Sequence, residues 1–224
     1  DDADGRASDN IGLLYEHGQG VPQDYTKAMK WYRKGADEGN ADALNHVGLF
    51  YGNGKGVPQD YTEAMKWYQK AADKGDHHAL RNIGLHYKNG HGVPQDYAKA
   101  MKRYQKAADK GNVEALNNIA LLYDNGQGVP QDYAKAMKWY RKAAEKGDTH
   151  ALNNIGKLYD YGQGVPQNYA KAMKWYRKAS EKNDADGRAS DNIGLLYENG
   201  QGVPQDYAKA MKWYRKAADK GSAK

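Results

Sequence analysis

The side chains that could bind a metal ion are few and widely spaced in this sequence. His46 and His150 stand alone, while residues 76–78 form one short Asp-His-His run. The string Asp-Ala-Asp-Gly over 184–187 resembles the start of a calcium loop, but further ligands do not follow at the required spacing. Histidines separated in this way are usually solvated, so we expect no metal site and no bound cofactor.

An enzyme would need a nucleophile, an acid or a base held in one unique arrangement. The sequence has no cysteine, and its serines are limited to Ser8, Ser180, Ser190 and Ser222. Each Gly-x-Gly string is followed by Val-Pro rather than by the start of a helix, which is the wrong context for a phosphate-binding or dinucleotide-binding loop. We therefore expect a protein that is not an enzyme.

Asparagine is the polar residue whose spacing indicates a function. It recurs at one equivalent position in five copies of a repeated pattern, and a leucine usually follows three residues later. An amide both donates and accepts hydrogen bonds, so a row of amides could bind the backbone of an extended peptide. The alternative interpretation is that the asparagines cap or bridge neighbouring helices and that the leucines complete a core.

These equivalent positions recur because the chain is built from a repeat of 36 residues. The string Gly-x-Gly-Val-Pro-Gln occurs six times, and its prolines are 36 residues apart except for the last, which is 38 residues further on. They are Pro22, Pro58, Pro94, Pro130, Pro166 and Pro204. A period of this length is typical of helical repeat architectures.

The residue pattern in each copy predicts two short helices. In the first copy, apolar residues at helical spacing predict a helix over 6–17, and Gly18 suits the left-handed residue that ends it. Asp24 is predicted to cap a second helix that Gly39 closes. The glycine inside the first helix is replaced by Ala120 in the fourth copy, so this position requires a small residue rather than backbone freedom.

Paired antiparallel helices of this length stack into a solenoid, because one hairpin cannot bury both of its faces alone. We expect an all-α fold of twelve helices in six hairpins. The expected organisation is one domain over 1–224, with repeats at 5–39, 41–75, 77–111, 113–147, 149–183 and 187–221.

The repeated pattern resembles a known family. In the fourth copy, residues 115–123 read Ala-Leu-Asn-Asn-Ile-Ala-Leu-Leu-Tyr, and residues 126–144 read Gly-Gln-Gly-Val-Pro-Gln-Asp-Tyr-Ala-Lys-Ala-Met-Lys-Trp-Tyr-Arg-Lys-Ala-Ala. All six copies resemble the Sel-one-like repeat, a relative of the tetratricopeptide repeat. The resemblance implies a right-handed superhelix of α-hairpins and an adaptor or scaffold role, often in bacterial proteins that are exported or that engage host partners. Arg103 departs from the pattern by replacing a tryptophan, which predicts that this position is only partly buried.

By the same resemblance, the first helix of each copy lines the concave wall, where another protein or a peptide would bind. The candidate contacts are the residues that point away from the apolar stripe of those helices. They are Asn10, Leu13, His46, Leu49, His78, Asn82, Leu85, Asn118, Leu121, Asn154, Lys157, Tyr161, Asn192 and Leu195.

The charge pattern gives little support to a nucleic-acid partner. The net charge is +6, and acidic residues interrupt the lysines of the second helices, such as Lys27, Lys30 and Lys34. RNA binding stays an alternative, and it predicts a steep dependence on salt. No apolar run is long enough to span a membrane. The cellular compartment does not follow from the sequence, and the resemblance is compatible with a secreted or periplasmic bacterial protein.

A self-assembling array is the third interpretation. Residues 184–198 are identical to residues 2–16, which indicates a section of a longer natural array. The last predicted helix, around Met211 to Ala218, would expose apolar surface where a further first helix could pack. End-to-end association of chains is therefore an additional expectation.

Overall fold

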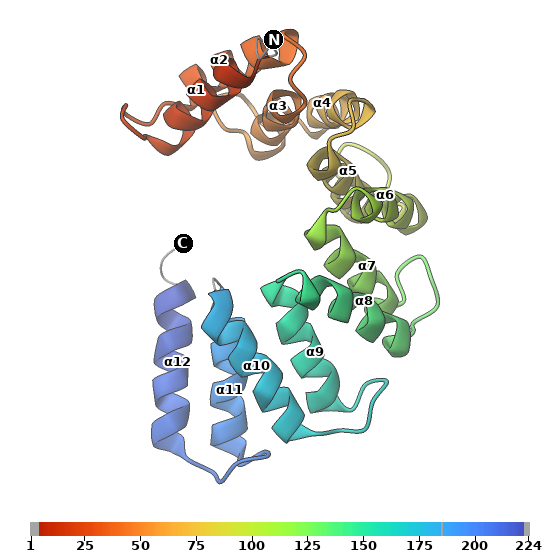
Figure 1. The fold of residues 1–224 in the computed structure, drawn as a ribbon, viewed down its shortest axis with the longest axis vertical. Coiled ribbons are helices and arrows are strands. Elements are labelled where there is room, and N and C mark those ends of the chain that lie inside the picture. The colour runs from red at the N-terminus through yellow and green to blue at the C-terminus, as the bar shows by residue number, and fades with distance from the viewer. Residues whose placement is uncertain (1–4, 185, 222–224) are drawn as a thin grey trace. The chain divides into compact units, whose positions relative to one another are not determined.

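The computed structural model describes residues 5–184 and 186–221, except for the side chain of Asn183 (Figure 1). Within these residues the chain forms twelve α-helices in six pairs that pack sequentially as a solenoid, which confirms the predicted fold class. The helices are α1 (Arg6–His17), α2 (Tyr25–Asp37), α3 (Ala41–Asn53), α4 (Tyr61–Asp73), α5 (His77–Asn89), α6 (Tyr97–Asp109), α7 (Val113–Asn125), α8 (Tyr133–Glu145), α9 (Thr149–Tyr161), α10 (Tyr169–Asn183), α11 (Arg188–Asn199) and α12 (Tyr207–Gly221).

The odd-numbered helices are called A helices below, and the even-numbered ones B helices. The chain divides into two compact units, Asp1–Ala115 and Leu116–Lys224. The first contains α1 to α6, the second contains α8 to α12, and the boundary lies within α7. The single domain expected from the sequence stays a prediction.

The loop inside each pair is fixed by the repeated Gly-x-Gly-Val-Pro-Gln-Asp string. Gly18 ends α1 in the left-handed conformation, with φ of 67°. The Asp24 carboxylate accepts a hydrogen bond from the backbone of Lys27 and begins α2, so the predicted cap is confirmed. The Gln23 amide donates to the carbonyl of Glu16, which ties the loop to the end of the A helix. Equivalent glutamine bonds occur in the other five pairs.

In five pairs the glycine inside the A helix lies under a tyrosine ring of the B helix. A Cβ atom placed on Gly84 would come within 2.4 Å of the ring of Tyr104, which is fully buried. Gly156 faces Tyr176 in the same way. Ala120 predicted that this position requires a small residue. The close packing of the tyrosine ring confirms this prediction and explains it.

In four pairs the hydroxyl of that tyrosine also bonds to an acidic residue in the last turn of the A helix. These bonds join Tyr32 to Glu16, Tyr140 to Asp124, Tyr176 to Asp160 and Tyr214 to Glu198. In the third pair Lys88 stands where the acid would be, and the buried hydroxyl of Tyr104 has no hydrogen-bond partner among the described residues. The second pair also lacks the acid, because Gly52 stands at that position.

The tryptophans of the B helices are half-buried. This agrees with the prediction made from Arg103, which occupies the tryptophan position in the third repeat. The ammonium group of Lys70, for example, lies 4.1 Å from the ring centre of Trp67, a favourable cation–π distance. None of the helices in the described part of the chain is both long and apolar enough to cross a membrane.

Candidate functional site

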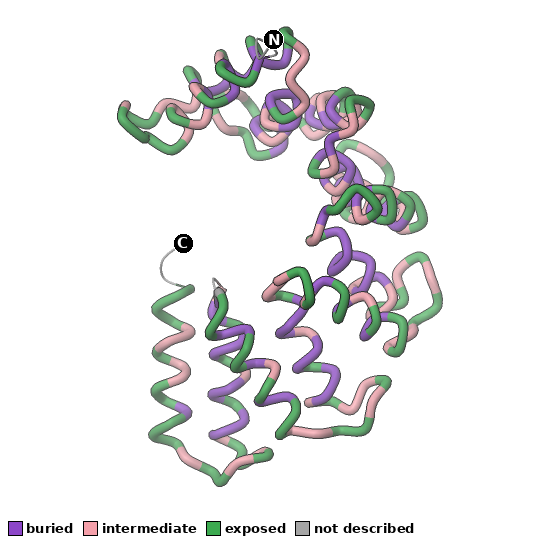
Figure 2. The backbone as a smooth tube through the Cα atoms, in the orientation of Figure 1, coloured by how far each residue is buried: buried purple, intermediate pink, exposed green. Residues whose placement is uncertain are grey.

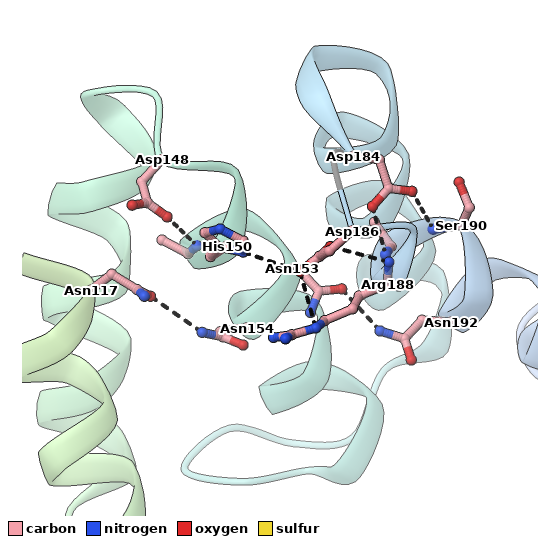
Figure 3. Close-up of polar contacts among 12 residues, drawn as sticks. Asn117, Asp148, His150, Asn153, Asn154, Asp184, Asp186, Arg188, Ser190 and Asn192 are labelled. Carbon is pink, nitrogen blue, oxygen red and sulfur yellow. Dashed lines mark hydrogen bonds and ion pairs between the residues drawn. The ribbon is translucent and has the colours of Figure 1, made fainter. Parts of the chain in front are cut away.

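Hydrogen bonds between side chains join successive A helices. In the first unit, Asn82 Nδ2 donates to Asn45 Oδ1 at 3.0 Å. In the second unit, Asn154 donates to Asn117 at 3.2 Å and Asn192 donates to Asn153 at 2.9 Å (Figure 3). We call each such bond a rung. A rung runs from an asparagine of one repeat to the residue that precedes the equivalent position in the repeat before it.

The first junction has the same rung with different chemistry. His46 replaces the donor asparagine and Asp9 replaces the acceptor, and their Nδ1 and Oδ1 atoms lie 2.7 Å apart. The Asp9 side chain is only 8% exposed. Burial works to lower the pKa of His46, but the hydrogen bond and the charge of Asp9 outweigh it and raise the pKa. The pair therefore behaves as a partly buried ion pair when the imidazole is protonated.

The asparagines predicted to contact a partner differ in how far they are buried. Asn82 and Asn118 are buried, Asn154 and Asn192 are half-buried, and Asn10 is exposed. Three of these amides donate to the preceding repeat, as the bridging interpretation expected. The predicted contacts that offer surface to a partner are therefore the remaining exposed side chains. They are Asn10, His78, Lys157, Tyr161 and Leu195, with the half-buried Leu13, His46, Leu49, Leu85 and Leu121 beside them.

In the second unit the helices α9, α11 and α12 and the two residues before α11 line a hollow of about 510 Å³. Lys157 and Tyr161 of α9 form one side, and Tyr161 is 61% exposed. The other side is polar and includes Asp186, which lies 3.6 Å from the imidazole of His150 and 3.0 Å from Arg188 Nε (Figure 3). The full lining is Asn153, Lys157, Tyr161, Asp186, Gly187, Arg188, Asp191, Asn192, Tyr214, Ala217 and Ala218.

In the first unit the A helices enclose a smaller hollow of about 350 Å³. It brings together four predicted residues and three others: Asp42, Asn45, His46, Leu49, His78, Arg81 and Asn82. Both hollows combine amides, a base and at least one carboxylate. Such a set can bind polar peptide groups and side chains of either charge.

Sequence reasoning did not select Arg81, Asp186 or Asp191. Arg81 and Asp191 belong to the column just before the asparagine column, which is polar in every copy and which supplies the acceptors of the rungs. That regular polarity was a usable signal. Among the described residues no three histidine, aspartate or glutamate side chains are grouped so that they could hold a metal ion. Ala185, in the string that resembled a calcium loop, lies outside the described residues.

Six helical pairs with one shared loop and a row of inter-repeat hydrogen bonds define a repeat protein of the α-solenoid class. The chain belongs to the Sel1 repeat family. The family model matches residues 6–40, 41–76, 77–112, 113–148, 149–184 and 188–222.

Solved structures agree with this assignment. A Sel1 repeat protein from Oxalobacter formigenes is 36% identical to this chain, with a TM-score of 0.88, and the match covers 97% of this chain and 88% of that one. A protective antigen present in uropathogenic Escherichia coli strains is 35% identical, with a TM-score of 0.76. That match covers 98% of this chain but 46% of the antigen, so this chain spans less than half of the antigen's length.

More distant structures share the fold alone. An immunity protein from Pseudomonas aeruginosa is 18% identical, with a TM-score of 0.68, and the match covers 97% of this chain and 83% of that one. A search of curated proteins found no match.

Proposed function

We propose that this chain is a non-catalytic scaffold that binds another protein or a peptide through the exposed side of its A helices. The observation that carries the proposal is the hollow of the second unit, in which the exposed ring of Tyr161 stands beside Lys157 and faces polar side chains. Tyrosine is enriched in protein interfaces because it combines a large apolar surface with a hydrogen-bonding group. The rungs hold the helices on both sides of this hollow in register.

The charges in the two hollows favour a protein partner over RNA. The hollow of the second unit contains Asp186 and Asp191 beside Lys157 and Arg188, and that of the first contains Asp42 beside Arg81. Carboxylates at these places repel phosphate groups, whereas a protein partner can present both basic and acidic side chains. The lysines predicted to face outward on the B helices, including Lys27 and Lys30, are exposed, away from the hollows that we assign to the partner.

The names of two similar proteins state no catalytic activity. The relatives that share this fold are described as a protective antigen and as an immunity protein. The binding role proposed for this chain does not depend on either name. It depends on the exposed side chains of the A helices.

The test is an affinity capture from lysates at two salt concentrations, with and without nuclease, followed by variants. We expect a specific protein that is retained at high salt, and we expect Lys157→Ala combined with Tyr161→Ala to weaken its binding at least about tenfold. Lys138→Ala combined with Lys174→Ala, at exposed positions of B helices, is the matched control and should bind normally. Retention of nuclease-sensitive material alone, and only at low salt, would instead support RNA binding. Equal binding by both double variants would refute the assignment of this hollow.

A further inference from the structure

Arg81 lines the hollow of the first unit, and most of its hydrogen-bonding capacity is unused. Its Nη1 atom donates to Asn82 Oδ1 at 3.2 Å, and Arg81 makes no other side-chain hydrogen bond or ion pair among the described residues. The Nε atom is buried and has no partner there. A guanidinium has five N–H donors and no acceptor, and a buried donor that lacks an acceptor is costly. Arg81 is therefore placed to take an acceptor from another molecule.

The two pairs around Arg81 also lack the acids that other pairs use internally. In four pairs the tyrosine packed on the A helix bonds to an acid, but Gly52 and Lys88 stand at that position in the second and third pairs. Burial raises the pKa of the corresponding Tyr68 and Tyr104, and the charge of Arg81 works to lower it. No carboxylate within these two pairs neutralises that charge.

The hollow of the second unit differs in this respect. Its arginine, Arg188, has Nε 3.0 Å from a carboxylate oxygen of Asp186, so this charge is balanced within the chain. The lining of the first hollow contains one carboxylate, that of Asp42, which is exposed and forms no ion pair with Arg81 among the described residues. The first hollow is therefore the one that offers an unpaired cation.

The rest of the first hollow adds a donor and an apolar side chain. Asn112 donates to Nδ1 of His78 at 3.4 Å, so Nε2 carries the proton of the neutral His78 ring. Leu49 is half-buried in the same lining. Buried residues run along α3 and α5, the two helices that hold this lining (Figure 2). A hollow of about 350 Å³ has room for one side chain or for the end of a peptide.

We propose that the hollow of the first unit binds a single carboxylate of a protein partner through the guanidinium of Arg81. The planar guanidinium matches a carboxylate, which can accept two parallel hydrogen bonds from it. Nη1 is bonded to Asn82, so the free Nη2 donors receive the carboxylate, and rotation of the long side chain also presents Nε. Asp42 repels further negative charge, so the hollow suits one carboxylate rather than an acidic run.

The carboxylate can belong to an aspartate or glutamate side chain or to the C-terminus of a chain, because both sources carry the same group. The inference rests on the proposed function for its source, a protein partner. The binding of the group itself is a property of the first hollow and does not involve Lys157 or Tyr161.

Titrations that follow the Nε–H resonance of Arg81 in proton–nitrogen correlation spectra test the proposal, and Arg81→Gln identifies that resonance by removing it. One probe is N-acetylglutamate N-methylamide, which carries a side-chain carboxylate, and the other is N-acetylalanine, which carries a terminal one. We expect a saturable shift, and the probe that binds more tightly identifies the source. N-acetylglutamine N-methylamide has nearly the same shape without the charge and should cause no such shift.

Variants test whether charge decides the binding, with affinities taken from backbone amide resonances of α3 and α5. Arg81→Gln should weaken carboxylate binding at least about tenfold, because a charge-assisted hydrogen bond is lost. Asp42→Asn should strengthen it about twofold, because an exposed like charge is removed. Arg188→Gln, in the second hollow, is the matched control and should bind like the wild type. Far-UV circular dichroism verifies that each variant is folded.

The proposal is overturned if neither carboxylate probe causes a saturable shift, if the glutamine probe binds equally well, or if inorganic phosphate binds more tightly than both carboxylates. Equal affinities of the Arg81→Gln and Arg188→Gln variants would overturn it as well. Failure of the Lys157 and Tyr161 variants to affect a captured protein would leave these titrations unchanged, so the two proposals fail separately.

Discussion

His46 occupies the position of the donor asparagines, yet its bond to Asp9 depends on pH. The pKa of His46 lies above its usual value of 6.5, because the nearby carboxylate outweighs the effect of burial. The folded state therefore binds this proton more tightly than the unfolded state does. The stabilisation is fully present below pH 6.5 and is lost as the pH rises through the raised pKa of the folded state.

His46→Asn should remove this dependence, because an amide can donate to Asp9 at any pH. We expect the free energy of unfolding of the wild type, relative to that of the variant, to decrease between about pH 6 and about pH 8. Urea unfolding at both pH values measures it. A difference between the two proteins that does not change with pH would show that the proton on His46 does not contribute.

Tyr104 gives a second prediction at the level of one side chain. Its hydroxyl is buried without a hydrogen-bond partner among the described residues, and Lys88 stands where four other repeats have an acid. Lys88→Asp should supply the acceptor and stabilise the protein by about 1 kcal/mol. The same change in a Tyr104→Phe background is the control, and thermal unfolding of the four proteins measures the coupling. An equal effect in both backgrounds would mean that the new carboxylate does not bond to the hydroxyl.

At the level of the helices, the packing between A and B helices leaves no room for larger side chains. Ala136 of α8 is fully buried, whereas Ala134, two residues earlier, is exposed. Ala136→Leu should destabilise the protein by about 1–3 kcal/mol through overpacking. Ala134→Leu should leave the free energy of unfolding nearly unchanged, and chemical denaturation compares the two. Similar stabilities for the two variants would contradict this account of the core.

The helices and their caps were predictable because their signals are local. The cap at Asp24 and the left-handed Gly18 lie within a few residues of the helix ends that they define. The rungs were not predicted in detail, because the acceptor of Asn82 lies 37 residues earlier on another A helix. The sequence therefore indicated the correct column of asparagines but not which of them face neighbouring repeats rather than solvent. The two hollows depend on the same packing between repeats, so their linings were only partly predicted.

For the whole molecule, stability in a repeat array is a sum over repeats and their contacts with neighbours. Residues 169–179 and 207–217 have identical sequences, so their intrinsic rates of amide exchange are closely similar. We expect the α12 segment to exchange faster than the α10 segment, because among the described residues only α10 is covered by a following A helix. Hydrogen exchange with mass spectrometry measures both in one sample. Equal protection in a monomeric sample would contradict this view.

The rungs have a direction, since each runs from a donor in one repeat to an acceptor in the repeat before it, and this affects how genes for such arrays can change length. Unequal recombination between similar repeats removes or adds whole units of 36 residues. Loss of the third copy would place Asn118, whose buried Nδ2 has no hydrogen-bond partner among the described residues, after the acceptor Asn45 and make a new rung. Loss of the fourth would place the donor Asn154 after Arg81, whose guanidinium can only donate. Shortened arrays of the first kind should therefore fold better than those of the second.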